Sequence, residues 1–271
     1  MISIKDVSYT YMKGTPFEKT ALKNISFDLA EGEVLAIAGH TGSGKSTLIQ
    51  IIAGLIKLTS GAIEIDGLSV DDKKIRRLVG MVFQYPEHQL FEETVESDIA
   101  FAPKNFGLSN AEISARVDEA MRQVGLDTKL KKVSPFELSG GQRRRVAIAG
   151  ILALKPKYLI LDEPTAGLDP LAKENLLKEI FGDVKKSGVT IILVSHNMED
   201  IASFANRVVV LAQGEILFIG TPRELFAKED ILARAGLEPP PIIQLLRTIK
   251  IGEQALTLDE AEKIILTKCR R

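Results

Sequence analysis

The stretch that decides the fold reads Gly39-His40-Thr41-Gly42-Ser43-Gly44-Lys45-Ser46-Thr47. It follows the pattern of a phosphate-binding loop: a glycine, four residues and a second glycine, then lysine and serine or threonine. The glycines let several backbone N–H groups point at one anion, and the helix that follows adds the positive end of its dipole. We expect Lys45 to contact the β- and γ-phosphates of a nucleotide, and the Ser46 hydroxyl to bind Mg²⁺.

The sequence on both sides of this loop supports phosphate binding over a chance match. The nearly continuous apolar run at 33–39 predicts a strand that is buried on both faces, as in a parallel sheet. A helix is predicted from about residue 45 to residue 56. Strand, loop and helix in this order are what the phosphate-binding mechanism requires.

Further out, the chain alternates between strand and helix patterns. Residues 2–9 and 22–29 alternate apolar and polar side chains, which predicts half-buried strands. A helix is predicted at about 171–186. The remaining predicted strands are 62–66, 78–83, 157–161 and 189–195, followed by a hairpin at 208–220 that turns at Gln213-Gly214. This alternation predicts a three-layer α/β core.

Two regions depart from that alternation. Residues 86–137 carry more charge and repeat their apolar side chains with helical spacing, which predicts an inserted helical subdomain. After Thr221-Pro222 the pattern is again helical, and it is interrupted by the prolines at 239–241. The last 45 or so residues are therefore predicted to form a separate small helical unit.

Two carboxylates follow the predicted strand at 157–161. Because ligands bind beyond the carboxyl ends of strands in open α/β sheets, Asp162 and Glu163 should lie near the bound phosphates. Asp162 suits the Mg²⁺ shell, and Glu163 is the candidate base for the attacking water. Alone, such a pair could equally cap the next helix. His196 follows the strand at 189–195 and is the candidate contact of the γ-phosphate, the alternative being a packing residue.

A second glycine-rich helix start lies at 138–142, where Leu138-Ser139-Gly140-Gly141-Gln142 precedes a helical pattern. Ser139 is a good N-cap, and the two glycines expose amide N–H groups to an anion. The chain already has one complete phosphate loop. A second anion-binding start therefore calls for a second ligand or a second copy of the protein.

These motifs, in this order, resemble the ATP-binding subunits of ABC transporters over roughly residues 1–225. The resemblance implies a head-to-tail dimer in which each ATP lies between residues 39–47 of one subunit and residues 139–142 of the other. It also implies that Tyr11 stacks on adenine and that Asp169 belongs to a loop communicating across the dimer. Gln84 would sense the attacking water and join Ser46 and Asp162 at Mg²⁺.

A finer resemblance lies in 82–91, Val-Phe-Gln-Tyr-Pro-Glu-His-Gln-Leu-Phe, and in the two short runs that follow, Thr94-Val95 and 101–103. These residues are similar to those of the ATPases of energy-coupling factor transporters, which take up vitamins and transition-metal ions. The resemblance implies that the segment after Gln84 receives coupling helices of a transmembrane scaffold protein. A separate membrane-embedded subunit would capture the substrate. The ATPase would then sit peripherally on the cytoplasmic face of the cell membrane.

Taken together, the expected fold is α/β. A phosphate-loop NTPase core of the ABC ATPase type carries an N-terminal antiparallel β subdomain, a helical insertion and a C-terminal helical extension. The expected domains are 1–225, with the helical subdomain at about 86–156, and 226–271. The C-terminal addition also resembles that of energy-coupling factor ATPases, which implies that 226–271 is a dimerisation extension. Whether the partner ATPase is the same chain or a similar one stays open.

Composition limits the alternatives. The formal net charge of −1 argues against nucleic acid as a partner, and the arginines at 143–145 are predicted to be a solvated helix face. Three histidines and the single Cys269 form no metal-ligand cluster, and no stretch is apolar for the roughly 18 residues of a membrane span. A non-transport ABC ATPase, for example in iron–sulfur cluster assembly, remains the alternative. A phosphate-loop kinase is excluded, because kinases of that type lack the Leu-Ser-Gly-Gly-Gln motif found at 138–142.

Overall fold

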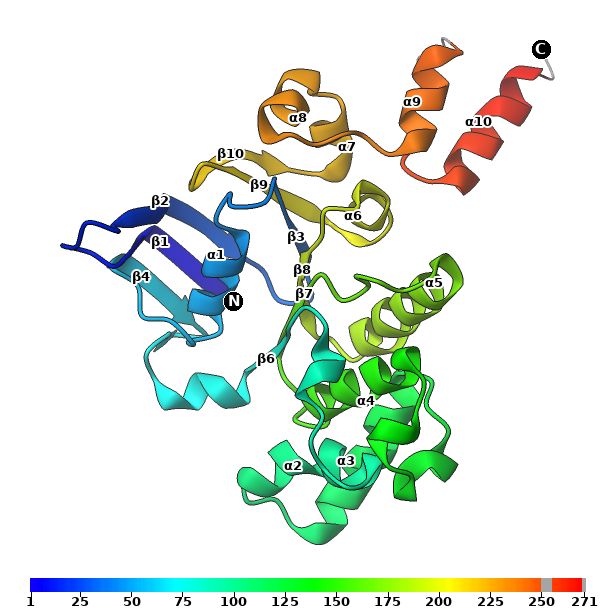
Figure 1. The fold of residues 1–271 in the computed structure, drawn as a ribbon. Helices are drawn as coiled ribbons and strands as arrows, with labels where there is room; N and C mark the ends of the chain where they lie inside the picture. Colours follow the sequence, from blue (N-terminus) through cyan, green and yellow to red (C-terminus); the bar gives the residue numbers. More distant parts are fainter. Residues whose placement is uncertain (250–254, 270–271) are drawn as a thin grey trace. The chain divides into compact units, whose positions relative to one another are not determined.

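The fold is described from a computed structural model, which describes residues 1–249 and 255–269 of the chain. Two compact units are present: Met1–Val70 with Ile192–Arg271, and Asp71–Ile191. Each unit combines strands and helices, and the predicted α/β class is confirmed (Figure 1). The boundary between the units falls inside strand β8 (Thr190–Val194), so each unit is described by itself.

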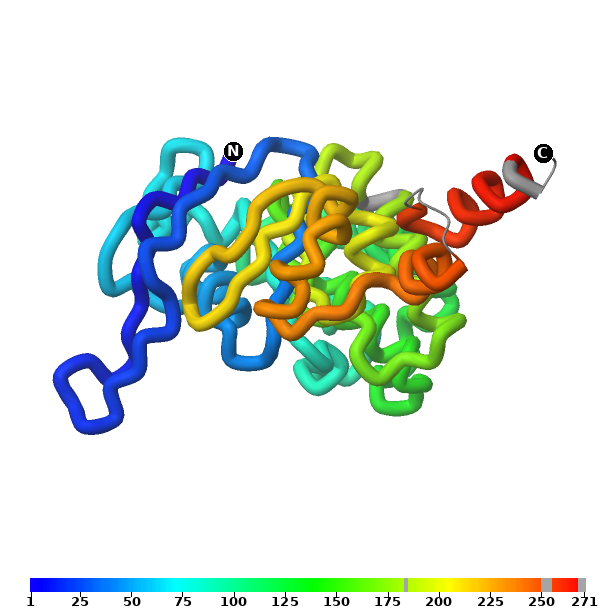
Figure 2. The backbone as a smooth tube through the Cα atoms, turned by 90° about the horizontal axis from the view of Figure 1, so that it is seen from above, coloured from blue at the N-terminus to red at the C-terminus, as the bar shows by residue number. Residues whose placement is uncertain are grey.

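The first unit begins with an antiparallel sheet in the order β2-β1-β4-β5. Its strands are β1 (Ile2–Tyr11), β2 (Lys19–Leu29), β4 (Ser60–Ile65) and β5 (Leu68–Ser69). Ile2 lies opposite Leu29 on one side and Ile65 on the other, and all three side chains are buried. The predicted strands at 2–9, 22–29 and 62–66 are confirmed. The loop between β1 and β2 extends away from the sheet and is the blue loop at the lower left of Figure 2.

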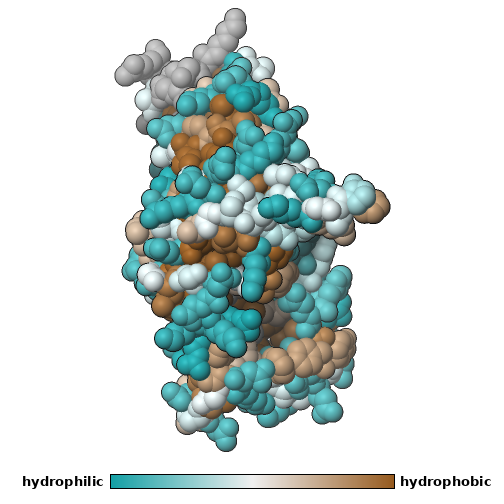
Figure 3. All heavy atoms as spheres, turned by 90° about the vertical axis from the view of Figure 1, so that its left-hand side faces the viewer, coloured by the Kyte–Doolittle hydropathy of each residue, from teal (hydrophilic) through white to brown (hydrophobic). Residues whose placement is uncertain are grey.

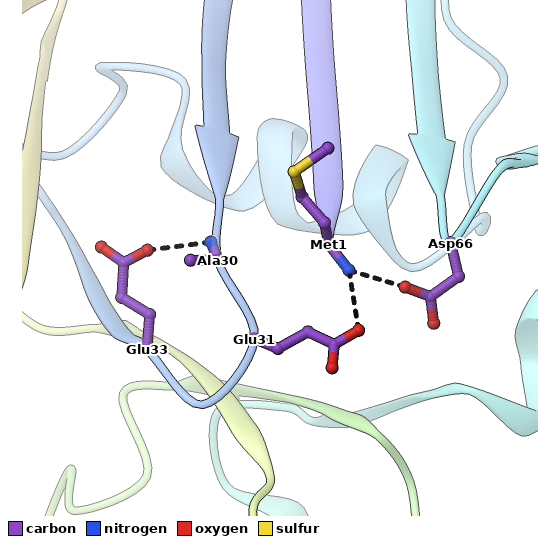
Figure 4. Close-up of polar contacts among 5 residues, drawn as sticks. All are labelled: Met1, Ala30, Glu31, Glu33 and Asp66. Carbon is purple, nitrogen blue, oxygen red and sulfur yellow. Dashed lines mark hydrogen bonds and ion pairs between the residues drawn. The ribbon is translucent and has the colours of Figure 1, made fainter.

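Polar contacts close the end of this sheet (Figure 4). The N–H of Ala30 donates to the Glu33 carboxylate over 3.0 Å and so fixes the turn between β2 and β3 (Val34–Ala38). The Met1 ammonium group donates to Asp66 over 2.6 Å and to Glu31 over 3.4 Å. These contacts hold the start of β1 against the ends of its two neighbours.

The first unit also contains β3, which pairs in parallel with β9 (Arg207–Ala212). β9 pairs antiparallel with β10 (Glu215–Gly220), and their turn carries the left-handed residues Gln213 and Gly214, which confirms the predicted hairpin. All five residues of β3 are buried, as the apolar run predicted. The helices of this unit are α1 (Lys45–Ile52), α6 (Met198–Phe204), α7 (Pro222–Phe226), α8 (Glu229–Ala235), α9 (Pro241–Thr248) and α10 (Leu258–Cys269).

The C-terminal helices pack in two places. α7 and α8 bury Leu225, Phe226 and Leu232 in the same core as β3, β9 and α6. α9 and α10 share a smaller cluster around Leu246 and Ala261. The expected division between a domain at 1–225 and an extension from 226 stays a prediction.

The second unit holds two parallel strands, β6 (Val79–Val82) and β7 (Tyr158–Asp162). The inserted region is helical, as predicted, with α2 (Val95–Asn105), α3 (Asn110–Gln123) and α4 (Gly140–Leu152). Short 3-10 helices occur at Lys73–Arg77, Pro86–Gln89 (η2), Thr128–Lys132 and Pro135–Glu137. The helix predicted at 171–186 is present as α5 (Pro170–Glu179), which continues as a π-helix at Ile180–Val184.

One prediction about this unit is wrong. The arginines at 143–145 do not form a solvated helix face, because Arg144 is only 2% exposed. Arg144 lies on α4 one turn before Ile148, which is buried, so the same helix face carries both inward. Arg143 and Arg145 are half-buried, and Arg145 forms an ion pair with Glu179.

No helix of the described residues is long and apolar enough to cross a membrane. On the one face drawn in Figure 3, hydrophobic side chains form patches separated by hydrophilic ones. Several large apolar side chains are nevertheless exposed, among them Phe17 and Phe91.

Candidate functional site

The phosphate loop connects β3 to α1, and two of its glycines could not be replaced without moving the backbone. Gly39 has φ +145°, and a Cβ there would lie 2.2 Å from the Leu211 carbonyl oxygen. Gly44 has φ +110°, and its Cβ would lie 2.7 Å from the Ala21 carbonyl oxygen. The loop therefore packs closely against the backbone of β9 and β2, and this packing fixes its curvature.

The interior of the loop suits an anion. Gly44 is the N-cap of α1 and offers no side chain to cap it, so the helix start presents backbone N–H groups. The Lys45 ammonium group donates to the carbonyl oxygens of Gly39 over 2.7 Å and His40 over 3.0 Å. The Ser43 hydroxyl is buried and has no hydrogen-bond partner among the described residues. A cradle of donors around an ammonium group fits a triphosphate.

Tyr11, at the end of β1, lies against the phosphate loop. Its hydroxyl is 3.0 Å from the Thr47 hydroxyl, and its ring meets the Tyr9 ring edge-on at 4.7 Å. The Tyr11 side chain is partly exposed. The structure therefore brings Tyr11 to the loop, while stacking on adenine remains a prediction.

Gln84 and Glu163 meet in the second unit. They follow the neighbouring parallel strands β6 and β7, and the Gln84 amide nitrogen donates to the Glu163 carboxylate over 3.1 Å. Glu163 takes the left-handed backbone conformation with φ 47°, which is rare outside glycine and recurs at functional sites. Asp162, the last residue of β7, is half-buried beside it in the sequence.

Residues 139–142 begin α4 as predicted. The Ser139 hydroxyl accepts the N–H of Gln142 over 3.3 Å, and the Gln142 side-chain oxygen accepts the N–H of Ser139 over 3.1 Å. This capping box confirms Ser139 as the N-cap. A Cβ on Gly140 or Gly141 would meet nothing within 4 Å, so this helix start is open to a ligand.

Two further predicted residues lie at helix starts. The Asp169 carboxylate caps α5 by accepting the N–H of Ala172 over 2.9 Å. His196 is exposed and directly precedes Asn197, which caps α6. Their predicted roles in dimer communication and γ-phosphate contact stay predictions.

The oxygen atoms of the predicted Mg²⁺ ligands suit magnesium. The described residues contain no cluster of three or more His, Cys, Asp or Glu side chains that could hold a metal. Mg²⁺ does not need one, because it is usually bound by one or two protein oxygens together with phosphate and water. The oxygens of Ser46, Gln84 and Asp162 are hard donors of this kind.

Sequence reasoning missed the ion pair between Arg144, which is buried, and Glu87, which is partly buried and lies three residues after Gln84 in the chain. A signal for Arg144 exists in the helical spacing, since it falls four residues before Ile148 on the apolar face of α4. For Glu87 the sequence carries no such signal.

Comparison with known proteins gives a consistent result. The family model described as "ABC transporter" matches residues 22–166. The energy-coupling factor transporter ATP-binding protein EcfA2 of Caldanaerobacter subterraneus subsp. tengcongensis is 52% identical, covering 99% of this chain and 98% of that protein. The EcfA2 of Clostridium perfringens is 50% identical, covering 98% of this chain and 97% of that protein.

Solved structures show the same fold. CbiO1 of Clostridium perfringens, part of the ABC transporter complex CbiONQ, has a TM-score of 0.77 at 37% identity, covering 92% of this chain and 98% of that one. The ATP-binding cassette MJ0796, solved as a dimer bound to ADP and Pi, has a TM-score of 0.73 at 33% identity. That match covers 82% of this chain and 99% of the cassette.

Proposed function

The chain belongs to the ABC transporter family, and from this premise we propose that it is the ATP-hydrolysing subunit of an energy-coupling factor transporter. It powers the uptake of vitamins or transition-metal ions through a separate membrane complex. The observation that carries the proposal is the contact between Gln84 and Glu163 at the ends of two parallel strands. A carboxylate held at this edge, in a chain with a phosphate loop, is suited to direct water at a phosphate.

ATP binding begins at residues 39–47. The N–H groups of the loop and of the start of α1 donate to the phosphate oxygens. Lys45 exchanges its two carbonyl acceptors, Gly39 and His40, for negatively charged phosphate oxygens, which strengthens its hydrogen bonds. Tyr11 supports the adenine ring.

Hydrolysis depends on the second unit. Glu163 accepts a proton from the attacking water, and Gln84 keeps the carboxylate oriented by donating to it. Ser46, Gln84 and Asp162 would hold Mg²⁺, and His196 would contact the γ-phosphate. Bound Mg²⁺ supplies charge neutralisation on the phosphates.

A second ATPase subunit completes the site. The open helix start at Ser139–Gln142 contributes its N–H groups to an ATP held by the phosphate loop of the partner. ATP binding holds the dimer closed and hydrolysis releases it. The partner is the same chain or a homologous one.

The membrane partners dock on the segment after Gln84. Leu90 is buried there, whereas Phe91 is 57% exposed and meets the exposed Phe101 edge-on at 4.8 Å. An exposed aromatic pair of this kind suits a helix of a transmembrane scaffold protein. The chain then lies peripherally on the cytoplasmic face of the cell membrane, next to a substrate-capture subunit. The similarity to energy-coupling factor ATPases over nearly the whole chain disfavours a role in iron–sulfur cluster assembly.

The test of the catalytic assignment is Glu163→Gln in the complex purified with its membrane partners. The variant should bind ATP normally but lose turnover by about 10²-fold or more, the range for a missing general base. Glu64→Gln, the same change on the exposed face of β4, is the control and should hydrolyse ATP at the parent rate. Near-normal hydrolysis by Glu163→Gln would refute the role of Glu163.

A further inference from the structure

Arg144 is a charged side chain buried inside the second unit. It lies on α4, two residues after Gln142, and only 2% of it is exposed. Burying a guanidinium group costs free energy unless every donor finds a partner, ideally an anionic one. The partners of Arg144 therefore indicate what the burial achieves.

Arg144 binds the Glu87 carboxylate through a bidentate pair of hydrogen bonds. Its Nε donates to Glu87 Oε2 over 2.9 Å, and its Nη2 donates to Glu87 Oε1 over 2.6 Å. Burial alone would raise the pKa of Glu87, but the hydrogen bond and charge of Arg144 bring this pKa below its ordinary value. The carboxylate therefore stays ionised against the guanidinium.

The remaining donor of Arg144 reaches a different segment. Nη1 donates to the carbonyl oxygens of Ala166 over 2.6 Å and Pro164 over 3.3 Å. Pro164 directly follows Glu163, and Glu87 lies three residues after Gln84. One guanidinium group thus joins the two segments that carry the contacting pair Gln84 and Glu163.

Both segments begin with strained backbone. Tyr85 and Glu163 are left-handed, with φ 54° and 47°. Such conformations cost about 1–3 kcal/mol each and persist only where the surroundings hold them. The Tyr85 ring lies 5.8 Å from the Arg144 guanidinium, stacks on His88 at 5.9 Å, and lies close to Gly167.

We propose that Arg144, together with Glu87, is a positioning residue for ATP hydrolysis. The guanidinium holds the segment after Gln84 and the segment after Glu163 at a fixed separation, and so keeps the amide and the carboxylate in the geometry that directs water. Arginine is required because lysine lacks the planar guanidinium group, which binds both Glu87 oxygens through Nε and Nη2 while Nη1 donates to the carbonyl groups. This inference rests on the proposed role of Glu163.

The test compares two similar ion pairs of α4 in the purified transporter complex. Arg144→Lys and Glu87→Gln disturb the proposed pair. Arg145→Lys and Glu179→Gln are the matched controls, because Arg145 also pairs with a glutamate and donates to a backbone carbonyl, that of Val124. For each variant, kcat, the KM for MgATP and the melting temperature are measured.

Arg144→Lys and Glu87→Gln should lower kcat by about 10-fold to 10²-fold, the cost of a misplacement of roughly 1 Å at a catalytic group, with KM changed by less than about threefold. The controls should lose melting temperature to a similar extent but keep kcat within about twofold of the parent. The double variant Glu87→Gln/Arg144→Lys should lose no more kcat than the more impaired of the two single variants, because both changes break the same interaction.

Equal kcat losses in the Arg144 and Arg145 pairs would mean that both pairs only stabilise the fold, and would overturn the inference. Unchanged kcat in Glu87→Gln would do the same, and this variant decides the matter if Arg144→Lys does not fold. Failure of the proposed function is recognised separately, by near-normal hydrolysis in Glu163→Gln.

Discussion

At the scale of single residues, side chains do more than their motif positions indicate. From the resemblance, Ser139 was predicted as a nucleotide contact and Asp169 as part of a loop that communicates across the dimer. Both act as N-caps in the structure. A capping side chain fixes where its helix starts, and therefore where the N–H groups of that start point. Local structure and a proposed functional role are compatible at both residues.

Tyr11 allows the ring and the hydroxyl to be tested apart. If the ring stacks on adenine, Tyr11→Ala should weaken ATP binding by about 10-fold or more, since stacking a base contributes about 1–3 kcal/mol. Tyr11→Phe keeps the ring and loses only the part-buried hydrogen bond to Thr47. It should bind ATP within about threefold of the parent, because a neutral hydrogen bond contributes about 0.5–1 kcal/mol. Equilibrium binding of a fluorescent ATP analogue measures both. Equal losses would assign the effect to the hydroxyl instead.

Part of the residue-level site could be predicted from the sequence. Residues 39–47 and the carboxylates at 162–163 follow short, contiguous patterns, and the structure places them at the strand ends where the patterns predicted them. The Arg144–Glu87 pair could not be predicted in the same way, because its partners lie 57 residues apart and meet only through the fold. Contacts of this length leave no local pattern in one sequence.

At the scale of elements, buried strands were the most predictable. β3, β7, β8 and β9 are nearly all apolar because both faces are covered, and a run of this kind has few alternatives. Ends were less predictable. α1 ends at Ile52 rather than near residue 56, because Gly54 is left-handed and stops the helix. The short 3-10 helices were missed, since single turns carry no periodicity.

The first turn of α2 orders the segment after Gln84 through Asp98. Its carboxylate accepts the N–H groups of Phe91 and Glu92 over 3.1 and 3.0 Å, and burial raises its pKa. Asp98→Ala should destabilise the protein by about 1 kcal/mol through the lost hydrogen bonds. Asp98→Asn keeps an acceptor oxygen and removes the half-buried charge, so at neutral pH it should match or exceed the parent in melting temperature.

The pH dependence of Asp98→Asn follows from the raised pKa. A carboxyl group whose pKa is higher in the folded than in the unfolded chain releases its proton more easily on unfolding, so stability falls as pH rises through this range. The advantage of Asp98→Asn should therefore shrink as the pH falls below the ordinary aspartate range. Thermal melts between pH 3 and pH 7 measure it. A variant that gains stability toward acid would contradict the assignment.

At the scale of the whole molecule, the two predicted kinds of nucleotide contact belong to different compact units of the chain. The phosphate loop lies in the first unit, and the open helix start at residues 139–142 lies in the second. The MJ0796 relative was solved as a dimer, in line with the ATPase pair of the proposed function. A protein built in this way needs surfaces for its partners, and exposed aromatic side chains are the first place to look.

Phe91 and Phe17 are both exposed. Substituting each in turn distinguishes a specific contact with a membrane partner from non-specific hydrophobic association. If the segment after Gln84 receives a membrane partner, Phe91→Ser should lower the recovery of integral membrane proteins on the tagged chain by about 10-fold, as for an interface anchor. Phe17→Ser, in the loop between β1 and β2, should leave recovery unchanged, and both variants should bind ATP like the parent. Mass spectrometry of eluates from detergent-solubilised membranes provides the measurement. Equal losses in the two variants would remove Phe91 from the contact, and recovery of only non-membrane partners by the parent chain would favour an ATPase without a transporter.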